Sequence, residues 1–227
     1  MAEEESSFRV EPKKKSKKTK RKQTFTNFKM MTQEDQYEWF GRLLVQNGGV
    51  SSMEYADAFA VERFLELRNA SRSLSKLANR VRSLVPTLKA GEDVCGAPSV
   101  LIVTGGARRA TDFVKALRPL RVRLMKAFAK HIKLKEQIEL AKTTCTPIAV
   151  GTPNRLEKLL SLSALSLARL ELVLIDTHRN QKEFTIFNMK QTSDDLFSLV
   201  RKHLLPIFAA AKREEAGARA NVRIGLL

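Results

Sequence analysis

Between residues 32 and 86, apolar residues recur every three or four positions, the spacing of a helix face that packs against a core. Thr32 followed by two acidic residues is typical of a helix start, and Pro86 is typical of a stop. The pattern predicts three helices. Their expected buried residues are Tyr37, Phe40, Leu43 and Leu44 in the first, Ala56, Phe59, Ala60, Phe64 and Leu67 in the second, and Leu74, Leu77, Ala78, Val81, Leu84 and Val85 in the third.

From residue 98 the pattern changes to short apolar runs separated by amphipathic segments. Strands are expected over 100–103, 121–128, 147–150, 172–175 and 221–226, and a long helix over 194–212 that Pro206 should kink or divide. Strands that alternate with helices predict an α/β fold, in which a parallel sheet carries helices on both faces. The carboxyl ends of such strands share one edge, so the turns after Val103, Val150 and Ile175 should lie together.

These patterns divide the chain into three parts. Residues 1–29 are expected to form a disordered basic tail, 30–97 a helical extension that ends in a linker, and 98–227 the α/β domain.

The charge of the chain indicates which class of partner it binds. The formal net charge is +17, of which residues 1–29 carry +6 and the remainder +11. A folded part this basic favours nucleic acid as the partner, and the alternative is that the charge serves solubility alone. The tail contains a run that favours nuclear or nucleolar targeting over an ordinary solvated tail: Lys13, Lys14, Lys15, Lys17, Lys18, Lys20, Arg21 and Lys22.

The sequence disfavours a metal-binding, membrane-spanning or secreted protein. Cys95 and Cys145 form no Cys-x-x-Cys pair, so we expect two reduced thiols and no metal site. No apolar run reaches the length of a membrane span, and the polar, acidic start of the chain does not read as a secretory signal. No cofactor is expected.

The turn Gly151-Thr152-Pro153-Asn154-Arg155 is the first candidate site. Glycine permits a close approach of backbone, Thr152 can cap a helix, Pro153 suits its first position, and the helix start presents N–H groups to an anion. Arg155 adds a guanidinium that can grip phosphate. The turn therefore favours phosphate binding, although Thr-Pro also begins many ordinary helices.

A second turn, Thr104-Gly105-Gly106-Ala107-Arg108-Arg109, has the same layout. A backbone-phosphate contact and a tight turn with solvated arginines are equally compatible with it. The basic run from Arg118 to Lys135, which includes Lys126, Lys130, His131 and Lys133, either extends a phosphate track or forms a solvated charged face.

Asp176 ends the fourth expected strand and is followed by Thr177-His178-Arg179. In an NTPase this aspartate would hold Mg²⁺ and the next acid would position the attacking water. Here Thr177 follows, and no Gly-x-x-x-x-Gly-Lys-Ser/Thr loop occurs in the sequence. A helix-capping role is the simpler interpretation of Asp176.

The sequences at 100–106, 150–156 and 172–176 resemble motifs Ia, Ib and II of the first RecA domain of DEAD-box RNA helicases. The degenerate form resembles the Cms family of pre-ribosomal proteins more closely, with support from residues 128–133, 176–182 and 222–227. The resemblance implies a RecA-like (P-loop NTPase-type) sheet that lacks the P-loop, and no ATPase activity.

The same resemblance implies a nucleolar protein of the small-subunit processome. Its expected partners are pre-rRNA or small nucleolar RNA and pre-ribosome assembly factors, and it would be a monomer within a large ribonucleoprotein. Two rival hypotheses remain: an active nucleotide-dependent RNA remodeller, and a pure protein–protein adaptor.

Overall fold

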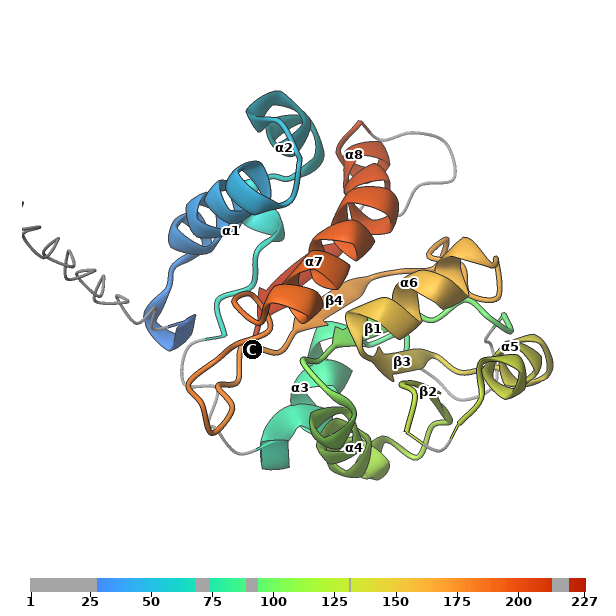
Figure 1. The fold of residues 1–227 in the computed structure, drawn as a ribbon. Coiled ribbons are helices and arrows are strands. Elements are labelled where there is room, and N and C mark those ends of the chain that lie inside the picture. The colour runs from blue at the N-terminus through green and yellow to red at the C-terminus, as the bar shows by residue number, and fades with distance from the viewer. Residues whose placement is uncertain (1–27, 68–73, 89–93, 131, 214–220) are drawn as a thin grey trace, which may run out of the picture.

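The computed structural model describes residues 28–67, 74–88, 94–130, 132–213 and 221–227 (Figure 1). The expected targeting run, almost all of the expected tail, and His131 lie outside these ranges.

Five parallel strands form the centre of the molecule: β1 (Val100–Val103), β2 (Leu124–Ala127), β3 (Ile148–Gly151), β4 (Leu172–Ile175) and β5 (Arg223–Leu226). Their order is β2-β3-β1-β4-β5, which places β1 between β3 and β4. All residues of β1, β3 and β4 are buried, as expected for a parallel sheet covered on both sides. The sequence prediction of an α/β fold with a parallel sheet is confirmed.

The second strand is shorter than the expected 121–128. A 3₁₀ turn, Arg118–Leu120, precedes it, and Arg121 adopts a left-handed conformation with φ of 55°. An extended strand cannot pass through such a residue, so β2 begins only at Leu124.

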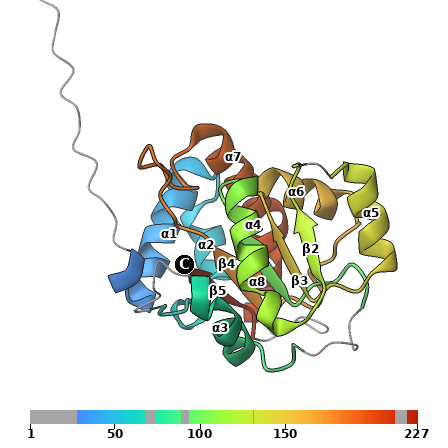
Figure 2. The same ribbon diagram turned by 90° about the horizontal axis from the view of Figure 1, so that it is seen from below.

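Helices cover both faces of the sheet (Figures 1 and 2). On one face, α3 (Leu77–Leu84) and α4 (Ala107–Ala116) pack into a core with Ile102, Val150 and Leu174. The core on the other face is shared with the remaining α-helices, which are α1 (Gln33–Asn47), α2 (Ser52–Ala58), α5 (Leu134–Thr143), α6 (Pro153–Ser161), α7 (Lys190–Leu199) and α8 (Leu205–Lys212).

The three helices expected before residue 86 are present, with one correction. Thr32 caps α1 as expected, but α2 ends at Ala58 instead of continuing to Leu67. Phe64 forms a parallel bridge with Ile224, and the Leu65 N–H donates to the Ile224 carbonyl at 2.8 Å. This segment lies along β5 because Phe64 is completely buried there in the core shared with α1.

Pro206 divides the long helix, as expected. A π-helical segment, Val200–Leu204, separates α7 from α8, and Pro206 lies in the first turn of α8. Proline lacks the N–H of a regular helix and its ring clashes with the carbonyl four residues earlier, so the backbone widens there.

The expectation of two free thiols is wrong in this structure, which pairs Cys95 with Cys145 in a disulfide. Cys95 lies before β1 and Cys145 lies before β3, two neighbouring strands, and their Cα atoms are 4.0 Å apart. No local pattern could reveal this pair, because fifty residues separate the two cysteines and only the sheet brings them together.

Candidate nucleic-acid interface

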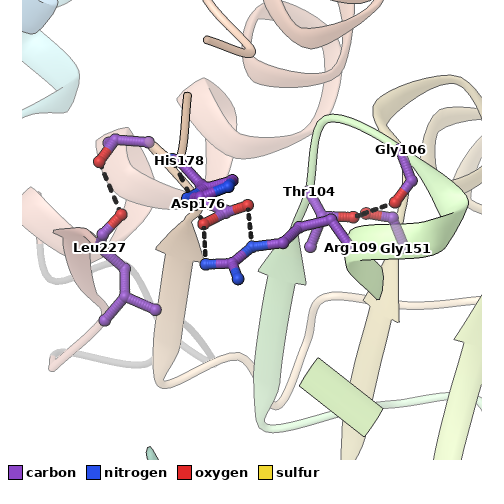
Figure 3. Close-up of polar contacts among 8 residues, drawn as sticks. Thr104, Gly106, Arg109, Gly151, Asp176, His178 and Leu227 are labelled. Atoms are coloured by element: carbon purple, nitrogen blue, oxygen red, sulfur yellow. Dashed lines mark hydrogen bonds and ion pairs between the residues drawn. The ribbon is translucent and has the colours of Figure 1, made fainter. Parts of the chain in front are cut away.

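The carboxyl ends of β1, β3 and β4 meet at one edge of the sheet, here called the carboxyl edge. The Thr104 N–H donates to the Gly151 carbonyl at 2.8 Å, and the Asp176 N–H donates to the Val103 carbonyl at 2.9 Å. The buried Thr104 hydroxyl lies 3.2 Å from the carbonyl oxygen of Gly151 and 3.3 Å from that of Gly106 (Figure 3). The two candidate turns are therefore bound directly to each other, as the parallel topology predicted.

The turn after β3 requires glycine for a steric reason. A Cβ atom on Gly151 would lie 2.2 Å from the Ala127 carbonyl oxygen, so no side chain fits. The Thr152 N–H donates to that same carbonyl at 3.0 Å. Thr152 is the N-cap residue of α6 and Pro153 its first residue, but the Thr152 side chain makes no capping hydrogen bond. The half-buried hydroxyl is therefore not engaged in capping the helix.

Arg155 is held in place by Gln137, a residue that was not among those predicted from the sequence. Its Nη1 donates to Gln137 Oε1 at 2.8 Å. Gln137 is only 1% exposed, and its Nε2 donates to the carbonyls of Lys126 at 2.6 Å and Phe128 at 3.0 Å. The amide thus connects α5, the end of β2 and Arg155 on α6. Its polar side chain on the otherwise apolar stripe of α5 was the signal available in the sequence.

The second turn directs its paired arginines differently. Arg108 is exposed, whereas Arg109 turns toward β4 and pairs with Asp176. Its Nε donates to Oδ2 and its Nη2 to Oδ1, both at 2.9 Å (Figure 3). Asp176 is 2% exposed, and the Arg109 guanidinium lies 5.0 Å from the centroid of the Phe113 ring.

Asp176 therefore does not cap a helix, which corrects the simpler interpretation of this residue. The segment after it, residues 177–189, contains no helix. Its carboxylate accepts from Arg109, and more distantly from the His178 backbone N–H at 3.4 Å. The Thr177 hydroxyl donates to the Leu227 carbonyl at 2.6 Å, so the position next to the aspartate serves to hold the end of β5.

The basic run from Arg118 to Lys135 is split by β2. Lys130 and Lys133 are exposed beyond the carboxyl end of this strand, and Lys126 is exposed within it. Arg118, Arg121 and Arg123 precede the strand and lie at the opposite edge of the sheet. The run is therefore not one continuous track along the carboxyl edge.

Within the described ranges, no group of three or more His, Cys, Asp or Glu residues could hold a metal ion. No helix in the same ranges is long and apolar enough to cross a membrane.

Similar proteins add independent information. Among solved structures, a DEAD box protein from Methanococcus jannaschii overlaps with a TM-score of 0.44 at 17% identity, covering 69% of this chain and 37% of that one. Protein CMS1 of Chaetomium thermophilum is 34% identical over 157 residues, which is 67% of this chain and 61% of that protein. Protein CMSS1 of Danio rerio is 30% identical over 145 residues, which is 63% of this chain and 50% of that protein.

The chain thus spans between half and about three fifths of the length of these relatives. A family model described as "CMS1: U3-containing 90S pre-ribosomal complex subunit" matches residues 50–215, which is most of the chain. The match includes β1 to β4 and both candidate turns, and it agrees with the family that the motifs resemble. The chain therefore belongs to the CMS1 family.

Proposed function

We propose that this chain is a non-catalytic, RNA-binding scaffold factor in small-subunit ribosome biogenesis, acting in the nucleolus as part of the 90S pre-ribosome during rRNA processing. The description of its family supports the pre-ribosomal role. The net charge of +17 supports an RNA partner, either pre-rRNA or small nucleolar RNA. Other assembly factors would be its protein neighbours, with the chain as a monomer among them.

The arrangement of Arg155 carries the RNA-binding part of the proposal. One Nη of the guanidinium is fixed by the buried amide of Gln137, and no described carboxylate pairs with the group. Its remaining N–H groups are thus pre-oriented at the start of α6, where the backbone N–H groups of a helix also favour an anion. This geometry suits a phosphate.

The neighbouring residues complete a phosphate-binding surface along the carboxyl edge. Buried Thr104 and Gly151 shape its turns, while Gly105, Gly106, Thr152, Arg108, Lys126, Lys130 and Lys133 are exposed or half-buried along it. Arg109, which was predicted from the sequence to bind phosphate, is excluded from this surface because its guanidinium binds Asp176. Contacts would be mainly to the backbone of RNA, since aromatic stacking platforms are sparse along this surface.

The pair of Asp176 and Arg109 supports the non-catalytic part. A buried carboxylate that already accepts two hydrogen bonds from a guanidinium is electrostatically neutralised. A divalent cation at this carboxylate would have to displace Arg109.

The remaining parts of the chain receive roles within the same proposal. The Lys-rich run within residues 1–29 would direct the chain to the nucleolus and add sequence-independent contacts to phosphate. Residues 30–97 would act as a helical extension, and 98–227 as the RNA-holding domain.

RNA affinity measured across a range of salt concentrations tests the proposal. Arg108→Ala with Arg155→Ala should weaken binding and reduce the salt slope by about 1 to 1.5, since each lost phosphate contact removes about 0.7 for single-stranded RNA. Lys158→Ala, which removes an exposed charge elsewhere on α6, is the control. An unchanged affinity and slope in the double variant would remove both arginines from the RNA site.

Two further measurements address the rivals. ATP hydrolysis by the purified chain that is lost in Asp176→Ala would establish an active remodeller and contradict the non-catalytic proposal. Failure of the chain to crosslink to RNA in cells would instead favour a protein–protein adaptor.

A further inference from the structure

The opposite edge of the sheet, formed by the amino ends of the strands, carries a second basic surface. Arg118 begins the 3₁₀ turn after α4, and Arg121 and Arg123 lie between that turn and β2. All three side chains are exposed. Arg82 of α3 is also exposed, and its Nη2 donates to the Pro119 carbonyl of the same turn at 3.4 Å. These four residues are here called the arginine cluster.

The cluster is not neutralised by nearby acids. The sequence contains no acidic residue between Asp112 and Glu136. Among the described residues, the ion pairs Arg109–Asp176, Arg179–Glu183 and Lys202–Glu157 include no member of the cluster. The stretch that contains Arg118, Arg121 and Arg123 therefore has no acid of its own to offset their positive charge.

The backbone of the turn is fixed, and its arginines contribute little to fixing it. Leu117 and Leu120 on one side and Met125 on the other are buried in the sheet cores. Arg121 has φ of 55°, a conformation that glycine or asparagine adopts at lower cost. An arginine at a strained, exposed position is poorly explained by local folding and better explained by what its side chain binds.

The arginine cluster and the carboxyl edge lie at the two ends of α4. This helix has ten residues, so its ends are roughly 15 Å apart at 1.5 Å per residue. That distance exceeds the screening length of about 8 Å at physiological salt, so the two surfaces act as separate anion sites. Exposed Lys115 lies seven residues after Arg108, on the same side of the helix, and lies between them.

We propose that the arginine cluster is a second RNA-backbone site, and that an RNA strand bound at the carboxyl edge continues along α4 to reach it. Arginine offers a planar pair of donors that matches a phosphate group, and no exposed aromatic ring accompanies the cluster among the described residues. Contacts at the cluster are therefore to phosphate and independent of base sequence. This inference rests on the proposed RNA-binding function and extends it from one edge of the sheet to both.

Asp112 allows a second test of the proposal, in which RNA affinity should rise instead of fall. It is exposed on α4, one turn after Arg108, and is the one acid of α4 beside the expected path. Its carboxylate should repel a passing phosphate. Replacing it with asparagine should therefore increase affinity, an effect that partial unfolding would not produce.

The test compares oligouridylates of two lengths, about 6 and about 24 nucleotides, by fluorescence anisotropy over a range of salt concentrations. With the full chain, R118A/R121A/R123A should weaken binding of the long RNA about tenfold, lower its salt slope by about 2, and leave binding of the short RNA within about twofold. D112N should bind the long RNA more tightly than the unmodified chain. A matched control, R42A/K158A/R201A, removes three exposed charges from the opposite face and should cause a smaller loss.

The outcomes separate this inference from the function on which it rests. If the unmodified chain fails to bind the short RNA, the proposed function fails. If the short RNA binds but the triple variant binds the long RNA as the control does, the second site is wrong and the carboxyl-edge site stands. Unchanged RNA binding together with lost binding to polyglutamate would assign the cluster to an acidic protein and overturn the RNA site.

Discussion

The turns after β1 and β3 look alike in sequence, since each joins a buried strand to a helix through glycine and brings arginine into the first turn of that helix. In the structure, the arginines of the two turns have different partners. Arg109 turns inward to a buried carboxylate, whereas Arg155 is steadied by a buried amide and keeps its charge available. The role of each arginine depends on the partner of its guanidinium. An arginine paired with a buried carboxylate stabilises the fold, whereas one bound to an amide remains free to bind an anion.

The glycines of the two turns also differ, in the space that surrounds them. A Cβ atom at Gly151 would overlap the Ala127 carbonyl, while a Cβ atom at Gly106 would meet nothing within 4 Å. The turn after β3 is therefore fixed by close packing of backbone, and the turn after β1 by an ion pair.

The largest expected effect is on the ion pair. Arg109→Ala leaves Asp176 buried without its partner, so the free energy of unfolding should fall by about 3 kcal/mol. Arg108→Ala, at the exposed neighbour, should change it by less than about 0.5 kcal/mol. Urea unfolding of both variants measures the difference, and equal effects would show that the pair does not stabilise the fold.

The two glycines give the next effect. Gly151→Ala should lower the free energy of unfolding by about 2 to 3 kcal/mol, because either β2 or β3 must shift to relieve the overlap. Gly106→Ala has space and an extended φ of −177°, so it should be neutral or slightly stabilising. Thermal unfolding of the two variants tests this, and a stable Gly151→Ala protein would refute the steric argument.

Gln137→Leu separates the placement of Arg155 from its charge. The carbonyls of Lys126 and Phe128 lose a donor, which should lower the free energy of unfolding by about 1 to 2 kcal/mol. RNA affinity should fall several-fold while the salt slope stays unchanged, because Arg155 keeps its charge but loses its orientation. In Arg155→Ala, by contrast, both affinity and slope should fall. Matching losses of slope in the two variants would argue against a positioning role for Gln137.

The smallest effect is a pH dependence outside the proposed RNA site. Burial lowers the pKa of His203 below 6.5, against an opposing effect of Glu157, and its Nε2 lies 3.3 Å from the Ser161 hydroxyl. The unfolded chain therefore binds a proton at higher pH than the folded one, so stability should decrease slightly as pH falls through about 6.5. The lowered pKa of Glu157, which accepts from Lys202, acts only below about 4.5, so the two contributions are separable. His203→Gln should flatten the curve of unfolding free energy between about pH 7 and 5.5, and an unchanged curve would exclude this histidine.

The parallel sheet and its carboxyl edge could be predicted from the sequence, because the spacing of apolar residues and the residue types at turns are local signals. Thr32 as a cap and Pro206 as a helix divider are confirmed for the same reason. The path of Phe64 along β5 and the pairing of Cys95 with Cys145 depend on contacts between distant segments, which a periodic pattern does not contain.

The candidate site was predictable only in outline. Strand ends and glycines located both turns, but the direction of each arginine depends on residues elsewhere in the chain. Gln137 is 18 residues before Arg155, and Asp176 is 67 residues after Arg109. The basic run also looked continuous, and only β2 showed that its two ends lie at opposite edges of the sheet.

The proposed function requires that the folded domain itself holds RNA at the carboxyl edge of its sheet. Crosslinking the full chain to RNA and identifying the modified peptides by mass spectrometry tests this most directly. We expect crosslinks within residues 104–116 and 151–155, at levels that fall when Arg108 and Arg155 are replaced by alanine. Crosslinks confined to residues 1–29, with none in the folded domain, would contradict it.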